Sequence, residues 1–98
     1  MRTIWKVELK AGVTQAELPV DHKVLTAQFQ RRQLCLWVEV ETDSPKETQV
    51  FEVVGTGHEM EPTCGERQYI STVQVQPDES LVFHVYHLVT ATMRIGTH

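Results

Sequence analysis

The chain has 98 residues and a formal net charge of −4, with 9 Lys and Arg against 13 Asp and Glu. This length predicts a single domain over residues 1–98. The scattered basic residues argue against duplex DNA or RNA as a partner, because proteins that bind phosphate backbones concentrate positive charge. No apolar run is long enough for a signal peptide or a membrane span, so the sequence predicts a cytoplasmic protein without membrane contact.

Short runs that alternate between apolar and polar residues follow one another along the chain, and turn-forming residues separate them. This period of two is typical of β-strands. Strands are expected at residues 2–9, 13–18, 23–30, 34–42, 68–76 and 81–88, and another runs from residue 48 into a corner at residues 55–58. Helical periodicity is missing from the sequence. The predicted fold is therefore all-β, with roughly six to seven antiparallel strands in a small sandwich or open barrel.

Turn signals fill the connections. Residues 30–33 suit a hairpin, residues 43–47 and 76–80 are expected to form turns, and residues 59–68 are expected to form the longest loop. The run at residues 81–88 is apolar on both faces, which predicts a strand that is central in its sheet or covered. The tail at residues 89–98 could extend the last strand, pair with another subunit or fray.

Strict alternation also predicts which side chains share one face of a strand. The two sets that it places together are Leu25, Ala27 and Phe29 in one strand, and Tyr69, Ser71, Val73 and Val75 in another.

The two tryptophans differ in their strand neighbours. Trp5 alternates in phase with Val7, which predicts a core position. Trp37 shares its face with Glu39 and Glu41, which is unlike a core face. A large aromatic side chain on a polar face indicates an interface or a binding site.

The residues that could carry catalysis or bind a metal form no recognisable site. His84 and His87 are three positions apart in a strand and so point to opposite faces, and His58 and Cys64 lack a second ligand pair at the usual spacing. Cys35 is expected to be a buried core thiol and Cys64 a separate exposed thiol in a loop. No nucleophile elbow or paired-carboxylate motif is present. We therefore expect no enzyme activity, no catalytic residues, no metal and no cofactor.

The sequence Gly55-Thr56-Gly57-His58 stands out because two glycines lie within three positions. Glycine permits unusual dihedrals or a close approach to the main chain, and amides exposed there could hold an anion. The stretch lacks the third glycine and the Lys-Ser/Thr of known phosphate loops, so a purely structural corner and a ligand-facing loop both stay open. The candidate ligand-binding residues are Lys6, Trp37, Gly55, Thr56, Gly57, His58, Tyr69 and His84.

Five short motifs resemble a family of small uncharacterised proteins that phages and prophages encode. The motifs are Met1–Lys6, Leu34–Trp37, Gly55–His58, Tyr69–Ile70 and Leu81–Val85. The resemblance covers nearly the whole chain and comes with no assigned activity. The chain departs from the family where Arg31-Arg32 replaces a turn that usually contains glycine, and where it continues beyond Tyr86. The resemblance implies a phage accessory protein that acts on its bacterial host.

Together these observations predict a non-enzymatic phage-encoded binder that counters host defence. In its sharpest form it is a sponge for a nucleotide-derived immune signal: Trp37 or Tyr69 stacks on the base, Gly55–Gly57 supply backbone donors, and His58 and Lys6 meet the phosphates. One alternative is a protein-binding inhibitor of a host immune complex such as CRISPR, and another is a structural or housekeeping phage protein. A homo-oligomer is expected because so small a domain has a limited core.

Overall fold

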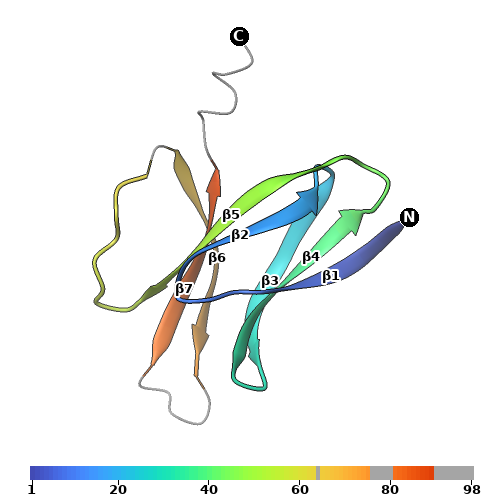
Figure 1. The fold of residues 1–98 in the computed structure, drawn as a ribbon. Coiled ribbons are helices and arrows are strands. Elements are labelled where there is room, and N and C mark those ends of the chain that lie inside the picture. The colour runs from blue at the N-terminus through green and yellow to red at the C-terminus, as the bar shows by residue number, and fades with distance from the viewer. Residues whose placement is uncertain (64, 76–80, 90–98) are drawn as a thin grey trace.

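The chain folds into β-strands joined by turns and loops (Figure 1). The computed structural model describes residues 1–63, 65–75 and 81–89, and no helix occurs within them. The strands are β1 (Arg2–Glu8), β2 (Gly12–Pro19), β3 (His22–Gln30), β4 (Gln33–Glu41), β5 (Lys46–Gly55), β6 (Glu66–Gln74) and β7 (Val82–Val89). The all-β prediction is confirmed.

The strands form two antiparallel sheets that face each other as a small sandwich and do not close into a barrel (Figure 1). One sheet has three strands in the order β1-β4-β3, and the other has four in the order β2-β5-β7-β6. The position of β7 between β5 and β6 confirms that the strand with two apolar faces is central. Among the residues that the structure describes, no helix has the length and apolarity needed to cross a membrane.

The core lies between the two sheets, where alternate side chains of the central strands point inward. In β4 the inward side chains Leu36 and Val38 are fully buried, and in the facing sheet Phe51 and Val85 are buried to the same degree. Each such side chain contributes about 1.5–3 kcal/mol when it is removed from water. Trp5 packs against this core, as predicted.

The only cysteine within the described residues, Cys35, is 1% exposed. Burial raises the pKa of its thiol, which therefore stays protonated at neutral pH. The prediction of a buried core thiol is confirmed. Cys64, the turn at 76–80 and the tail from 90 onward lie outside the described residues.

Two bulges change the faces that strict alternation predicts. The register of β3 shifts between Val24 and Thr26, and Leu25 at the bulge is 42% exposed, whereas Ala27 is buried. The prediction that Leu25 shares the face of Ala27 and Phe29 is therefore wrong. An extra residue in one strand moves every later side chain to the opposite face.

A second bulge lies in β6 between Tyr69 and Ser71. Tyr69 is 60% exposed, whereas Val73 is buried, so these side chains do not share a face as predicted. Ser71 instead faces β3: its hydroxyl accepts a hydrogen bond of 3.2 Å from the amide of Ala27 and lies 3.2 Å from the hydroxyl of Thr26. These contacts link β6 to β3 of the other sheet.

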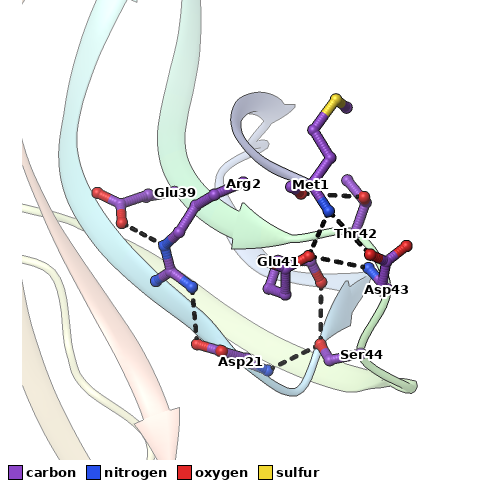
Figure 2. A network of polar contacts seen from close by, with 8 residues as sticks. All are labelled: Met1, Arg2, Asp21, Glu39, Glu41, Thr42, Asp43 and Ser44. Carbon is purple, nitrogen blue, oxygen red and sulfur yellow. Dashed lines mark hydrogen bonds and ion pairs between the residues drawn. The ribbon is translucent and has the colours of Figure 1, made fainter.

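A polar network fixes the start of β1 to the turn after β4 (Figure 2). Its residues are Met1, Arg2, Asp21, Glu39, Glu41, Thr42, Asp43 and Ser44. The terminal ammonium of Met1 donates to Glu41 at 2.5 Å and to Asp43 at 2.9 Å. The hydrogen bonds to both carboxylates raise the pKa of this amine, and the same contact lowers the pKa of Asp43.

Candidate functional site

The glycine-containing corner begins where β5 ends, at the buried residue Gly55. The amide of His58 donates to the carbonyl of Gly55 at 3.0 Å, and the amide of Thr56 donates to the carbonyl of Val82 at 3.0 Å. Gly57 has φ +86°, which L side chains rarely adopt. The corner is therefore a tight turn closed by its own hydrogen bonds.

The close approach that glycine permits at residue 55 is made by the protein itself. A Cβ added to Gly55 would lie 2.8 Å from Nδ1 and 2.9 Å from Cε1 of His58. The imidazole of His58 thus lies against the backbone of Gly55. Since the amides of Thr56 and His58 are already hydrogen-bonded, the turn offers a ligand fewer backbone donors than the phosphate interpretation requires.

Side chains next to the corner form a continuous hydrogen-bonded chain. The hydroxyl of Thr56 lies 2.7 Å from Nε2 of His84, whose Nδ1 lies 3.0 Å from the hydroxyl of Thr72. The same hydroxyl of Thr72 lies 2.7 Å from the hydroxyl of Tyr69. We call these four residues the hydroxyl–imidazole chain. Thr56 lies in the turn directly after β5, His84 lies in β7, and Thr72 and Tyr69 lie in β6; these three strands are neighbours in the sheet.

The hydroxyl–imidazole chain lies on the outer face of the four-stranded sheet. His84 precedes the fully buried Val85 in β7, so its side chain points away from the core. Thr56, Thr72 and Tyr69 are exposed. Each hydroxyl can rotate to donate or to accept, so the chain can adapt to groups of either kind on a ligand.

Tyr69 of the hydroxyl–imidazole chain and its neighbour Tyr86 form an aromatic surface. The rings of Tyr69 and Tyr86 meet edge to face, with their centroids 5.9 Å apart and an interplanar angle of 70°. Tyr69 is 60% exposed, which leaves much of its ring accessible to solvent. An exposed aromatic ring next to polar side chains is suited to stacking on a planar ligand.

A buried ion pair ties the loop after the corner to the sheet. Glu52 lies in β5 and is 7% exposed, and Nε of Arg67 in β6 donates to its Oε1 at 2.6 Å. Arg67 also donates to the backbone oxygen of Glu61, in the loop between these strands. The pairing with Glu52 raises the pKa of Arg67. Through this arginine, the loop that follows the corner is fixed to its own sheet.

The structure brings six of the eight sequence candidates to one region. Gly55, Thr56, Gly57 and His58 form the corner, and His84 and Tyr69 belong to the hydroxyl–imidazole chain beside it.

The other two candidates, Lys6 and Trp37, lie in the three-stranded sheet, where they face each other across β1 and β4. Lys6 donates to Gln30 at 2.9 Å, and Trp37 is half-buried on the outer face. They therefore do not join the site at the corner.

The sequence interpretation did not include Thr72, Tyr86, Glu52 or Arg67. Thr72 and Tyr86 join the site only through the pairing of β6 with β7, which one strand's pattern does not reveal. Glu52 carried a signal, because it is a lone charge in the apolar run from Val50 to Val54. Within the described ranges, no three His, Cys, Asp or Glu side chains are placed so that they could hold a metal ion.

The comparison with protein families gives one match. Residues 1–94 match the model of a family described as Domain of unknown function (DUF7352). The chain belongs to this family. Neither the curated proteins nor the solved structures include a significant match to it. The resemblance to an uncharacterised family is thus confirmed, while its phage origin stays a prediction.

Proposed function

We propose that this DUF7352 protein is a non-enzymatic binding protein that takes a small nucleotide-like ligand on the outer face of its four-stranded sheet. The observation that carries the proposal is the hydroxyl–imidazole chain, which runs from Thr56 at the corner to the exposed ring of Tyr69. Polar groups that can donate or accept and an aromatic ring lie together there. Ribose hydroxyls or phosphates would meet the polar groups, and a base would stack on the ring.

Binding fits these side chains better than catalysis does. In a nucleophile–histidine pair, a carboxylate normally holds the imidazole in the required tautomer and stabilises its charged form. Here His84 lies between two threonine hydroxyls, Thr56 on one ring nitrogen and Thr72 on the other. Neither hydroxyl stabilises an imidazolium as a carboxylate does, which favours a role in hydrogen bonding.

The biological role that we propose follows from the family resemblance of the sequence motifs. A phage accessory protein of this kind would act in the cytoplasm of the infected host and sequester a nucleotide-derived immune signal. Self-association would place two such surfaces in one assembly and increase the ligand bound per particle. The ligand class and the antagonism of host defence belong to the same proposal, but separate experiments test them.

Thermal unfolding with a panel of cyclic and ADP-ribose-type nucleotides tests the ligand class. A ligand at one hundred times its Kd stabilises the folded state by about 2.7 kcal/mol, which is a shift of several degrees for a domain of this size. The shift should disappear in His84→Ala and in Tyr69→Ala. It should persist in the matched control Trp37→Ala, which removes an aromatic ring from the other sheet. No shift with any nucleotide of the panel would refute this ligand class.

A second candidate function, inhibition of a host protein, is favoured by the outer face of the three-stranded sheet. Trp37 is half-buried there, and Ile4 on the neighbouring strand β1 is 56% exposed. Aromatic and apolar side chains on an open sheet face are typical of protein interfaces. This function predicts that a host protein copurifies with the wild type and with Tyr69→Ala but is lost from Trp37→Ala. Loss of the host protein from Tyr69→Ala alone would assign it to the other sheet.

A further inference from the structure

The turn between β3 and β4 has an unusual backbone for its sequence. It contains only Arg31 and Arg32, because Gln30 and Gln33 are the last paired residues of the two strands. Arg31 has φ 51° and Arg32 has φ 68°. Two-residue hairpins of this geometry normally use Asn-Gly, since Gly lacks a Cβ and the short polar side chain of Asn tolerates the left-handed region, which is unfavourable for most other residues. The hairpin therefore holds two strained arginines.

Arg32 lines a cavity of about 160 Å³ at this end of the sandwich. The same end contains the start of β7 (Figure 1), and Phe83 from that strand lies beside Phe29 from β3, with their ring centroids 6.2 Å apart. The apolar lining residues are Leu9, Ala11, Phe29, Leu34, Val53 and Phe83. The cavity thus offers an apolar interior large enough for one ring.

The polar lining of this cavity is basic. Lys10 and Arg32 contribute to it, and no acidic residue is found among its described lining residues. The remaining polar side chain, Gln33, is already engaged, since its amide nitrogen donates to the carbonyls of Leu9 at 2.7 Å and Leu34 at 3.0 Å. Lys10 and Arg32 are therefore the charged residues among the described lining of this cavity.

Arg31 lies on the other side of the hairpin, where it lines a depression of about 400 Å³ together with Lys6 and Glu8. The carboxylate of Glu8 offsets part of the positive charge on that side. The hairpin end thus gathers four of the 9 Lys and Arg of a chain whose net charge is −4: Lys6, Lys10, Arg31 and Arg32. Of the two sides, the Arg32 cavity combines positive charge with an apolar interior.

We propose that this cavity binds a small organic anion, with an apolar ring against Phe29 and Phe83 and a carboxylate or phosphate at Arg32 and Lys10. Strained backbone conformations occur preferentially at functional sites, where the strained conformation is part of the function. Here the left-handed turn holds Arg32 beside the cavity. The site is separate from the hydroxyl–imidazole chain and does not depend on the function proposed for that chain.

Titration of the ¹⁵N-labelled protein with phenyl phosphate tests the proposal. Phenyl phosphate carries both required parts, whereas inorganic phosphate lacks the ring and phenol lacks the anion. The amides of Lys10 and Gln33 should shift with phenyl phosphate, and its Kd should be at least about fivefold lower than that of either partial probe. Equal affinity for phenyl phosphate and phenol would overturn the role of the two cations.

The decisive variant is Arg31→Asn/Arg32→Gly, which supplies the residues that the turn geometry prefers. It should unfold at a higher temperature than the wild type and bind phenyl phosphate at least about fivefold more weakly. Arg32→Lys should retain part of the binding, and Lys23→Ala, outside the cavity lining, should leave it unchanged. Undiminished binding by the stabilised double variant would refute the proposal, as would phenyl phosphate shifts confined to other parts of the protein. Binding of an acidic peptide in preference to phenyl phosphate would likewise contradict a small-molecule site.

Discussion

Each of the two sheets has a turn that contains residues with positive φ. The two turns differ in the type of residue that adopts this backbone conformation. The corner at residues 55–58 uses glycine: Gly57 has φ 86°, and Gly55 leaves room for the ring of His58. The β3–β4 turn uses Arg31 and Arg32 in the same region of backbone space. Glycine at the corner is explained by the turn itself, whereas the arginines are strained.

The comparison of the two turns shows that a residue type indicates function only where the local backbone conformation does not already explain it. The two glycines first attract attention in the sequence, but the local structure accounts for both of them. The functional interest at the corner moves to the side chains beside it, above all His84 and Thr56. At the hairpin, Arg31 and Arg32 are ordinary surface residues by type, but they indicate a function because this turn geometry favours Asn and Gly.

The largest expected effect comes from Arg67→Ala, which removes the cation from the buried carboxylate of Glu52 and releases the loop after the corner. A buried charge that loses its partner is strongly destabilising, so the melting temperature should fall by roughly 5 °C or more. Arg2→Ala is the matched control, because Arg2 also forms ion pairs, with Glu39 at 2.5 Å and Asp21 at 3.0 Å, but its side chain is 40% exposed. A fall in Arg2→Ala as large as that in Arg67→Ala would contradict this account of the corner.

The next effect is a pair of opposite changes at the two turns. Gly57→Ala places a Cβ at φ 86° and should lower the free energy of unfolding by about 1–2 kcal/mol. Arg31→Asn/Arg32→Gly should raise it by about 1–2 kcal/mol, because both strained positions receive residues that tolerate positive φ. Urea unfolding of the two variants measures both signs. If both variants were destabilised, the arginine turn would not be strained.

A smaller effect is expected from Gly55→Ala. The new Cβ would overlap the ring of His58, which is exposed at its outer side and can move away, so we expect a loss of about 1 kcal/mol. His58→Ala should then make Gly55→Ala nearly neutral. A double-mutant cycle in urea measures this coupling. Additive effects of the two changes would show that the imidazole does not occupy that space in solution.

The smallest expected effect is a pH dependence of stability that arises from His87 in β7, outside both turns. His87 stacks on Phe51 with ring centroids 4.8 Å apart and donates through Nε2 to Gln49 at 2.8 Å. Burial, and next the electrostatic interaction with His22, lower the pKa of His87 below its usual 6.5. The neutral ring therefore stabilises the fold fully above pH 6.5, and this contribution is lost as the pH falls below that value.

Melting temperatures between pH 7.5 and pH 5 measure this contribution, with His87→Gln as the comparison. The variant should show a weaker fall on acidification, while Gly57→Ala and Arg31→Asn/Arg32→Gly should keep the wild-type slope. A turn variant that removed the slope would place the acid sensitivity at that turn.

Much of the fold could be predicted from the sequence because its strands alternate clearly. The expected strand at residues 34–42 differs by one residue at each end from β4, Gln33–Glu41. The bulges at Leu25 and Ile70 could not be predicted, because the phase shift that an extra residue causes is hidden where apolar side chains are adjacent in the sequence, as at Val24-Leu25 and Tyr69-Ile70. The predicted face of Tyr69 is wrong for this reason.

The candidate site was predictable in part. Gly55–His58, Tyr69 and His84 meet at one region, but their convergence depends on the order β5-β7-β6, which no local pattern specifies. Lys6 and Trp37 lie in the other sheet, because neither the charge of Lys6 nor the polar strand face of Trp37 specifies which sheet their strands join. The strain at Arg31 could have been inferred, because two residues between paired strands require positive φ.

One titration tests the central claim, that side chains beside the corner and the strained hairpin are two separate binding sites. The ¹⁵N-labelled wild-type protein is titrated first with ADP-ribose and cyclic nucleotides and then with phenyl phosphate, and the shifted amides are compared. The account predicts that a nucleotide of this panel shifts Thr56, Thr72 and His84, and that phenyl phosphate shifts Lys10 and Gln33. One common set of shifted amides for both kinds of ligand, or no response of Thr56 and His84 to any nucleotide, would contradict it.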